Sequence, residues 1–350
     1  MITHLIDNVN GHASNQIDKI REACLTLRPK LVVFSMVFNH APFLKDYFEG
    51  IISQKTNFPF VVIIHDDAST DGSKKIITKY SEKYPEIINP IFEDENQYSK
   101  RNGEIERIMC KVIDATGAKY VAFCEGDDYW IDPLKLQKQV DFMESHHDYG
   151  FVHTNVYSVH WESDYNKFVS FQRNPPEGEV YNQLLERNFI FTPTVLVRKC
   201  LVDKLRKEVY PVPYLDRIMW LCFSRYTKFH YLQDITSVYR VLKNSATHGE
   251  YKKILDFDIK CTNDILTYLS KTKSPQTEIN KCYQSRLPRL LKYSYFAEDE
   301  NNLKKYWHLI KTNSKPSISD YAYYWMGRLK IPVKLADFLK QIKRQITGRF

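Results

Sequence analysis

Two long apolar runs near the start of the chain constrain its fold more than any other feature. Residues 31–38 read LVVFSMVF and residues 58–66 read FPFVVIIHD, each of strand length. Continuous runs of this kind are expected for strands that are buried on both faces of a parallel sheet. Between them, residues 41–54 carry apolar side chains at helical spacing. The sequence therefore predicts a strand, a helix and a second, parallel strand.

The same alternation continues along the chain. The next segments we expect are a helix with Ile76, Ile77, Tyr80 and Tyr84 on one face, strands at 87–92 and 119–124, and a helix at 132–143. Asp132 is the expected N-cap of the last helix, and Pro133 its first residue. Strands that alternate with helices imply right-handed crossovers. The expected fold class is α/β, with a Rossmann-like mixed, mostly parallel sheet flanked by helices.

The pattern changes after residue 150. We expect short strands near 150–159, 189–197 and 229–241, a helix around 214–226, and a helical chain from about residue 250 onward. Residues 1–30 are polar and weakly patterned, with a helical stretch near 17–26. These changes predict an N-terminal extension (1–30), an α/β domain (31–248) and a helical C-terminal region (249–350).

The formal net charge of +8 is concentrated at one end of the chain. Residues 328–350 hold seven Lys or Arg side chains and one acid, Asp337. The rest of the chain is nearly neutral, which argues against a nucleic-acid groove through the main domain. No apolar run approaches the ~20 residues that would span a bilayer. The seven cysteines lack paired metal spacing, and the N-terminus lacks a signal-peptide pattern, so we expect a cytoplasmic protein with reduced thiols.

The basic C-terminal segment has two readings. Its apolar residues fall on one helical stripe with cations around it, which is typical of a helix on an anionic membrane surface. A surface helix that packs the same stripe on the rest of the chain is the alternative. The first reading predicts peripheral attachment to the cytoplasmic face of the inner membrane through residues 328–350.

Acidic side chains follow the second expected strand, in HDDASTDGS (65–73). A strand-to-helix turn accounts for its Ser, Gly and later Asp residues. It does not require Asp66 and Asp67 at the strand end. In open α/β sheets ligands bind beyond the carboxyl ends of the strands. The two carboxylates could accept hydrogen bonds from a nucleobase imide and a ribose hydroxyl.

A second acidic stretch, AFCEGDDYW (122–130), lies at the same expected sheet edge. Glu125, Asp127 and Asp128 repel one another unless they are solvated, cap a turn or bind a cation. A turn that leads to the Asp132 cap is the simpler explanation. A divalent cation, however, takes one or two carboxylates together with diphosphate oxygens and water. The two explanations are compatible.

The order of these motifs resembles the family-two glycosyltransferases with the GT-A fold, and more narrowly their bacterial polysaccharide-synthesis members. The resemblance covers residues 31–248 and rests on VVFSMVFNHAPFL, VVIIHDDASTDGS, NQYS, YVAFCEGDDYW, LDRIMWL and SVYRV. It implies that Ser35, Val37 and Asn39 line a nucleotide pocket. It also implies that Asp66 and Asp67 bind uracil and ribose.

The resemblance further implies a metal site and a catalytic base. Glu125 and Asp127 fall on the acid-x-acid motif that binds Mg²⁺ or Mn²⁺ and the donor diphosphate, with Asp127 the principal ligand. Asp216 matches the base that takes a proton from the acceptor hydroxyl in an inverting reaction. Without the resemblance, Asp216 would be interpreted as an acid at a helix N-terminus that is stabilised by the helix dipole.

Three features depart from the family pattern. The first acid of the metal motif is Glu125 instead of the commoner Asp. Leu242 stands where many relatives place a His. His248, six residues on, is the candidate substitute as a metal ligand, and a site that needs no His is the alternative. In YSKRNGE (98–104), Lys100 or Arg101 is a candidate diphosphate contact, with surface solvation the alternative.

The expected function is a metal-dependent hexosyl transfer from a nucleotide sugar, with UDP as the expected nucleotide, to a saccharide or lipid-linked saccharide. The alternatives are a sugar nucleotidyltransferase and a catalytically inactive GT-A binding protein. A nucleotidyltransferase would carry a glycine-rich phosphate loop after its first strand, and VFNHAPF has no glycine. The presence of Asp67, Asp127 and Asp216 together argues against an inactive protein.

Overall fold

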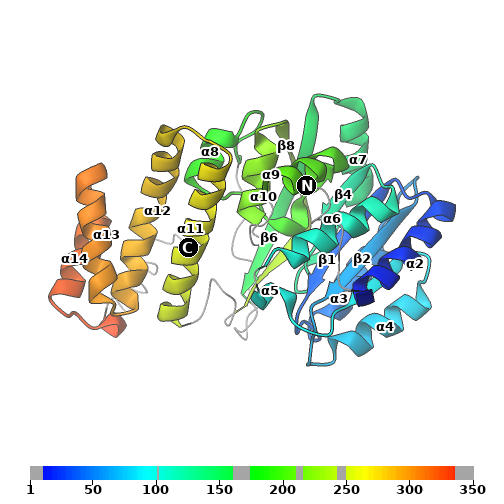
Figure 1. Cartoon of the computed structure of the whole chain (residues 1–350), viewed down its shortest axis with the longest axis horizontal. Helices are drawn as coiled ribbons and strands as arrows, with labels where there is room; N and C mark the ends of the chain where they lie inside the picture. Colours follow the sequence, from blue (N-terminus) through cyan, green and yellow to red (C-terminus); the bar gives the residue numbers. More distant parts are fainter. Residues whose placement is uncertain (1–10, 101, 161–173, 210–215, 243–249, 336–350) are drawn as a thin grey trace. The chain divides into compact units, whose positions relative to one another are not determined.

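The computed structural model describes the chain except for residues 1–10, 101, 161–173, 210–215, 243–249 and 336–350 (Figure 1). The chain forms two compact units. The α/β unit comprises residues 1–159, 170–184 and 188–240, and the helical unit comprises residues 160–169, 185–187 and 241–350.

An eight-stranded sheet forms the centre of the α/β unit, with the strand order β3-β2-β1-β4-β7-β6-β8-β5. The strands are β1 (Leu31–Val37), β2 (Phe60–Asp66), β3 (Ile88–Phe92), β4 (Tyr120–Phe123), β5 (Tyr129–Trp130), β6 (Tyr149–His160), β7 (Leu196–Arg198) and β8 (Lys228–Val241). Strands β3, β2, β1 and β4 pair in parallel, whereas β7 is antiparallel to β4 and β6, and β5 is antiparallel to β8. This mixed sheet, flanked by helices, confirms the predicted fold class (Figure 1).

The helices between the strands agree with the predicted alternation. They are α2 (Gly11–Leu27), α3 (Leu44–Ile52), α4 (Ser73–Lys83), α5 (Gln97–Lys100), α6 (Glu104–Thr116), α7 (Lys135–Ser145), α8 (Tyr181–Glu186), α9 (Lys199–Val209) and α10 (Asp216–Ser224), with a 3₁₀ turn at Thr192–Thr194. Helix α2 is longer than the predicted stretch and packs against α6 and β3. The Gln16 side chain fixes it there, because it donates to the Phe92 carbonyl and accepts from the Phe92 N–H.

The predicted start of α7 at Asp132 and Pro133 is wrong by two residues. The helix begins at Lys135, because the carbonyls of Asp132 and Pro133 accept hydrogen bonds from residues that follow α3. The Pro133 carbonyl accepts from the Lys55 N–H at 2.8 Å, and the Asp132 carbonyl accepts from the Gln54 side chain at 2.8 Å. Asp132 still stabilises the turn, since its Oδ1 accepts from the Leu134 N–H at 2.8 Å.

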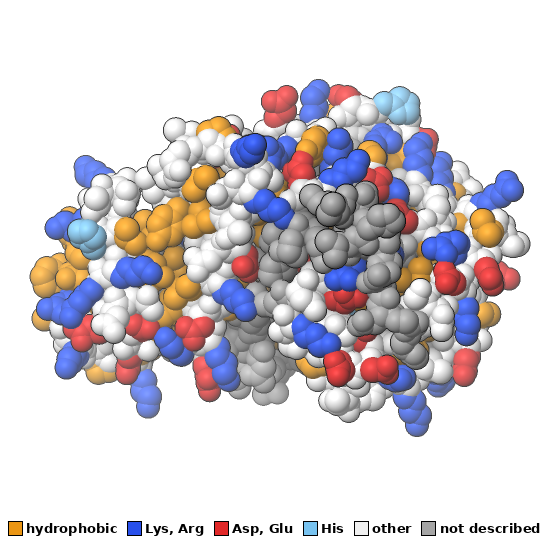
Figure 2. Space-filling model, in the orientation of Figure 1, with side chains coloured by type: hydrophobic (Ala, Val, Ile, Leu, Met, Phe, Trp, Pro, Cys, Tyr) orange, Lys and Arg blue, Asp and Glu red, His pale blue; other side chains and the backbone are white. Residues whose placement is uncertain are grey.

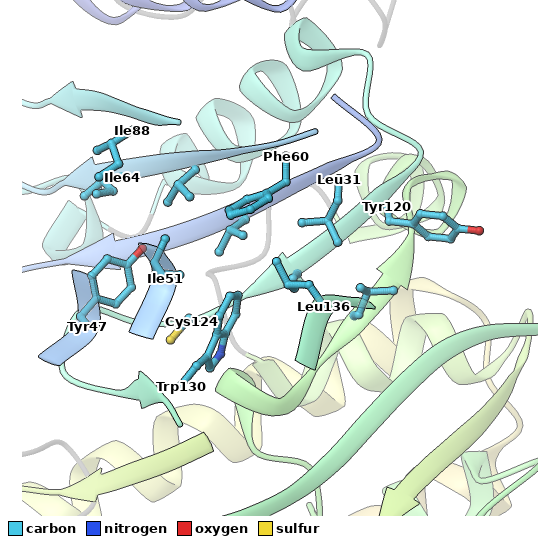
Figure 3. Close-up of a cluster of buried hydrophobic side chains, with 14 of the residues drawn as sticks. Leu31, Tyr47, Ile51, Phe60, Ile64, Ile88, Tyr120, Cys124, Trp130 and Leu136 are labelled. Atoms are coloured by element: carbon cyan, nitrogen blue, oxygen red, sulfur yellow. The ribbon is translucent and has the colours of Figure 1, made fainter. Parts of the chain in front are cut away.

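The main core lies where the parallel strands meet α3 and α7 (Figure 3). Tyr47 and Ile51 of α3 point into it together with Cys124 and Trp130, which lie on either side of residues 125–128 in the chain. Helix α3 approaches β5 so closely that a Cβ on Gly50 would be 2.5 Å from the Trp130 carbonyl oxygen. Both ends of the segment 125–128 are therefore anchored in the packed core.

The helical unit contains α11 (Tyr251–Lys271), α12 (Gln276–Phe296), α13 (Glu300–Asn313) and α14 (Ile318–Arg328). Asp299 caps α13, and Ser317 with Asp320 forms a capping box at α14. The helices share a second hydrophobic core, which includes Leu287, Leu291 and Tyr306. Among the residues that the structure describes, no helix is long and apolar enough to cross a membrane.

Candidate active site

The acidic loop, Glu125–Asp128, connects β4 to β5 and bends tightly against the end of β1. The Gly126 N–H donates to the Met36 carbonyl at 2.9 Å, and the Asp128 N–H donates to the Glu125 carbonyl at 3.0 Å. A Cβ at Gly126 would be 2.7 Å from Val37 Cγ2 and 3.0 Å from His40 Nδ1. Only glycine fits between the two acids, which gives the Glu-Gly-Asp pattern a steric reason.

The carboxylates of this loop are close together and poorly solvated. Burial, together with the charges of Asp127 and Asp216, raises the pKa of Glu125 to about 8. Burial and the neighbouring charge of Asp127 also raise the pKa of Asp128 well above its usual range. Asp127 Oδ1 and Asp128 Oδ2 are buried and have no hydrogen-bond partner among the described residues. Oxygen atoms in this condition are suited to an added cation.

Arg240, from β8, holds the backbone of the acidic loop. Its backbone N–H donates to Asp128 Oδ1 at 2.8 Å, and its Nη1 donates to the Asp127 carbonyl at 2.7 Å. Its Nη2 pairs with Asp46 of α3, and its guanidinium lies 4.3 Å from the centre of the Tyr129 ring. The side chain is only 2% exposed. Arg240 therefore positions the loop through its backbone, and Asp127 Oδ1 keeps no hydrogen-bond partner among the described residues.

Asp216 begins α10 and belongs to the same acidic site. Its charge acts on Glu125, 91 positions earlier in the chain. Its Oδ1 accepts from the Arg217 N–H at 2.6 Å, and its Oδ2 accepts from Asn188 Nδ2 at 3.3 Å. Burial raises the pKa of Asp216. A carboxylate with a raised pKa and a fixed orientation has the properties of a general base.

The acidic pair after β2 divides into two different roles. Asp66 Oδ1 accepts from the Ser69 N–H at 2.8 Å, whereas its buried Oδ2 has no partner among the described residues, and burial raises its pKa. Asp67 instead accepts from the Gln97 and Tyr98 N–H groups at 2.6 and 3.0 Å. Asp67 thus stabilises the first turn of α5, whereas one oxygen of Asp66 has no hydrogen-bond partner among the described residues.

The residues predicted to line the nucleotide pocket have contacts of their own. Ser35 is fully buried, and its hydroxyl shares a hydrogen bond with the Tyr47 hydroxyl. Val37 is fully buried against Gly126. Asn39 has a positive φ of 57°, and its Oδ1 accepts from the Thr70 N–H at 2.8 Å. The predicted nucleotide contacts of these side chains stay predictions, because Ser35 and Val37 belong to the core and Asn39 links the turns after β1 and β2.

Two predicted site residues, Arg101 and His248, lie outside the described residues. Lys100 is described, and its Nζ pairs with exposed Glu95 at 2.6 Å. Within the described part of the chain, no group of three or more His, Cys, Asp or Glu side chains forms a preassembled metal site. Mg²⁺ and Mn²⁺ in nucleotide sites need only one or two carboxylates beside phosphate oxygens. The unpaired Oδ1 of Asp127, next to Glu125, fits such an ion.

Tyr239 and Arg240 contribute to the site in ways that the sequence did not assign. Burial, followed by the charges of Asp128, Glu125, Asp127 and Asp216, raises the pKa of the Tyr239 hydroxyl. The motif SVYRV marked this pair without giving it a role. Nothing in the sequence pointed to Asp46 or Asn188, whose partners lie 194 and 28 residues away.

With the site described, the chain can be compared with known proteins. Residues 32–204 match the family model described as glycosyl transferase family 2. This region is a family-two glycosyltransferase domain. The resemblance predicted from the sequence motifs is confirmed.

Two relatives show how far the similarity of the sequence extends. An uncharacterized protein of Mycobacterium tuberculosis is 31% identical over 227 residues, which cover 63% of this chain and 61% of the relative. The match thus spans about three fifths of that relative's length. TuaG of Bacillus subtilis, named for teichuronic acid biosynthesis, is 26% identical over 234 residues, covering 64% of this chain and 84% of TuaG.

Solved structures of glycosyltransferases share the fold of this chain. The crystal structure of S. aureus TarS residues 1–349 in complex with UDP has a TM-score of 0.51 at 15% identity, covering 85% of this chain and 90% of that one. The mannosyltransferase PcManGT of Pyrobaculum calidifontis, in complex with GDP-Man and Mn²⁺, has a TM-score of 0.50 at 12% identity, covering 94% and 92%. At these identities the likeness shows the fold, which is of the GT-A type.

Proposed function

We propose that the chain is an inverting glycosyltransferase of bacterial surface-polysaccharide synthesis. It would move a sugar from a nucleoside diphosphate donor, with UDP as the expected nucleotide, to a hydroxyl of a glycan or lipid-linked saccharide. The observation that carries the proposal is the convergence of Glu125, Asp127 and Asp216, all half-buried, where the charges of both aspartates act on Glu125 just beyond the carboxyl end of β4. The UDP complex of TarS and the name of TuaG support the choice of donor and pathway.

The donor would be held from two sides. The unpaired Oδ2 of Asp66 is an acceptor for the imide N–H of uracil. Asp127, with Glu125 beside it, would hold Mg²⁺ or Mn²⁺, which neutralises the charge that develops on the leaving diphosphate. Arg240 keeps the Asp127 backbone in place through the bond from Nη1. The Mn²⁺ complex of PcManGT supports this role for a divalent ion.

The acceptor would be activated by Asp216. The Asn188 amide and the Arg217 N–H hold its two oxygens in a fixed orientation. Its raised pKa makes it a better proton acceptor than an exposed carboxylate. The acceptor oxygen attacks the anomeric carbon as its proton passes to Asp216, and the bond to the diphosphate breaks on the opposite side. A single displacement of this kind inverts the anomeric configuration.

The experiment is a screen of nucleotide sugars with Mg²⁺ or Mn²⁺, first for a rise in melting temperature and then for released products. A glycosyltransferase releases a nucleoside diphosphate, whereas a sugar nucleotidyltransferase forms or consumes pyrophosphate. Binding of a donor without any product would favour the inactive binding protein. If no nucleotide sugar raises the melting temperature, the proposal is wrong.

A matched pair of variants separates donor binding from catalysis. Asp216→Asn keeps the size of the side chain but removes the base, because one of the two acceptor oxygens becomes an amide donor. It should retain the donor-induced rise in melting temperature and lose at least about a hundredfold in transfer. Asp127→Asn should lose the metal-dependent part of donor binding itself. Full transfer by Asp216→Asn would show that another group is the base.

A location at the cytoplasmic face of the membrane, with attachment through residues 328–350, belongs to the same proposal. Residues 336–350 of this segment lie outside the described structure. The support is the charge of the segment, seven Lys or Arg against one acid. Deletion of 328–350 should lower co-sedimentation with anionic liposomes, and an unchanged yield would contradict the attachment.

A further inference from the structure

The outer face of α14 is apolar where a surface helix is normally polar. Its exposed apolar stripe consists of Ile318, Tyr321, Trp325 and Leu329, which are 91%, 45%, 54% and 68% exposed. Steps of three, four and four residues place these side chains along one line of a helix. Past the end of α14, Leu335 is a further exposed apolar side chain, at 48%.

The opposite face of the same helix is packed, so the stripe is held outward. Tyr323, Tyr324 and Met326 pack against the core of the helical unit, and Tyr324 stacks on Trp307 with ring centres 4.5 Å apart. At Gly327 the helix approaches α13 so closely that a Cβ would be 2.4 Å from Leu303. Rotation of α14 to bury the stripe would break this packing.

Cations surround the stripe, and the acids near it are engaged. Lys315 precedes α14, and Arg328, Lys330 and Lys334 follow it, all with exposed side chains. Asp320 is buried in the capping box with Ser317, and Glu300 pairs with Lys304 and Arg328. On the face that Figure 2 shows, hydrophobic side chains gather over the C-terminal helices with Lys and Arg side chains beside them.

We propose that α14 docks on an anionic lipid surface, with the exposed apolar stripe in the headgroup layer and the flanking lysines against the lipid charges. Trp and Tyr side chains favour this layer because one part of each ring is apolar and another is polar. The cations supply the complementary charge. A second copy of the chain fits the stripe less well, because it would bring the cations of both copies together.

The test measures co-sedimentation of the full chain with vesicles of phosphatidylcholine alone or mixed with phosphatidylglycerol. The wild-type chain should bind the mixed vesicles, and more weakly as salt rises. Ile318→Ser with Trp325→Ser should lower the partition coefficient at least about tenfold. Lys330→Glu with Lys334→Glu should also lower it at least about tenfold and flatten the salt dependence.

The control removes exposed apolar side chains from the α/β unit. Leu25 and Tyr226 are 70% and 44% exposed, so Leu25→Ser with Tyr226→Ser should leave vesicle binding unchanged. Binding should also shift the fluorescence emission of the wild type to shorter wavelength, and Trp325→Phe should reduce this shift. A chain that lacks residues 328–350 keeps Ile318, Tyr321 and Trp325 and should retain part of the binding.

Three results would overturn the proposal. The variant Ile318→Ser with Trp325→Ser could bind vesicles with the same partition coefficient as the wild type. The wild type could form a dimer that the serine variant dissociates, without vesicle binding, so that a second copy is the partner. The wild type could fail to bind vesicles while Ile318→Ser with Trp325→Ser lowers the melting temperature. This would show that other residues of the chain cover the stripe.

Discussion

Replacement of Arg240 by methionine tests how the acidic loop is positioned. Methionine has a similar length but no donors, and it leaves the backbone bond from residue 240 to Asp128 intact. The lost interactions include the bond to the Asp127 carbonyl, the pair with Asp46 and the contacts with the rings of Tyr129 and Phe43. The Asp46 side chain is 45% exposed, so that pair contributes little.

The expected effect on stability follows from these contacts. A hydrogen bond from a charged donor contributes about 1.5–3 kcal/mol, the ring contact about 0.5–2 kcal/mol, and a half-exposed ion pair at most about 1 kcal/mol. The free energy of unfolding should therefore fall by about 3 kcal/mol, measured by urea denaturation followed by circular dichroism. Arg240→Lys, which can reach only one of the two oxygen partners, should lose about half as much.

The effect on function separates positioning from general stability. Loss of a residue that orients a metal ligand typically costs about 10–100-fold in metal affinity. Arg240→Met should weaken Mn²⁺ binding by such a factor in calorimetry. The control is Arg198→Met, because Arg198 also holds backbone carbonyls, those of Met143 and Tyr149 at 2.7 and 2.9 Å, away from the acidic loop. That variant should lose stability but keep its metal affinity. Equal loss of affinity in both variants, or none in Arg240→Met, would refute the reasoning.

Three further predictions concern single positions. Gly126→Ala should lower the free energy of unfolding by about 1–3 kcal/mol and weaken Mn²⁺ binding, because its Cβ would lie 2.7 Å from Val37 Cγ2. Val37→Ala in the same chain should restore part of the metal affinity. No restoration would argue against this clash. Burial raises the pKa of Glu125 to about 8, so protons compete with the metal below that pH. Mn²⁺ affinity should rise between about pH 6 and pH 8, and it should rise less in Glu125→Gln. A wild-type affinity that does not change with pH would exclude Glu125 as a ligand. Burial lowers the pKa of Lys135 to about 7, so between that pH and the ordinary lysine pKa the unfolded chain binds more protons than the folded chain. The free energy of unfolding should therefore rise with pH from about 7 to about 10. The same slope in a Lys135→Met variant would contradict this origin.

Local patterns predicted most of the elements of the α/β unit. The apolar runs correspond to β1 and β2, and the acidic residues do follow β2 and β4 at one edge of the sheet. Such patterns are readable because strand and helix periodicity depend on neighbours a few residues apart. The start of α7 was misplaced, since contacts with Gln54 and Lys55, about 80 residues away, decide where it begins.

Which oxygen atoms remain free in the site could not be read from the motifs. Asp66 and Asp67 are adjacent and identical, but only the packing of α5 shows that Asp67 has both its oxygens bonded to backbone N–H groups while Asp66 keeps one unpaired. Ser35 looked available and is bonded to Tyr47 inside the core. The pairing of Arg240 with Asp46 spans 194 residues and leaves no local trace.

The sequence by itself determined the family, the α/β class and the candidate acids, because these depend on residue types at short or fixed spacing. The tertiary structure decided how the acids act together. It brought Asp216 near Glu125, left Asp127 Oδ1 unpaired and aimed Arg240 at the loop backbone instead of its carboxylate. The physical reason is that burial and charge interactions depend on distances in space, which only the folded chain sets.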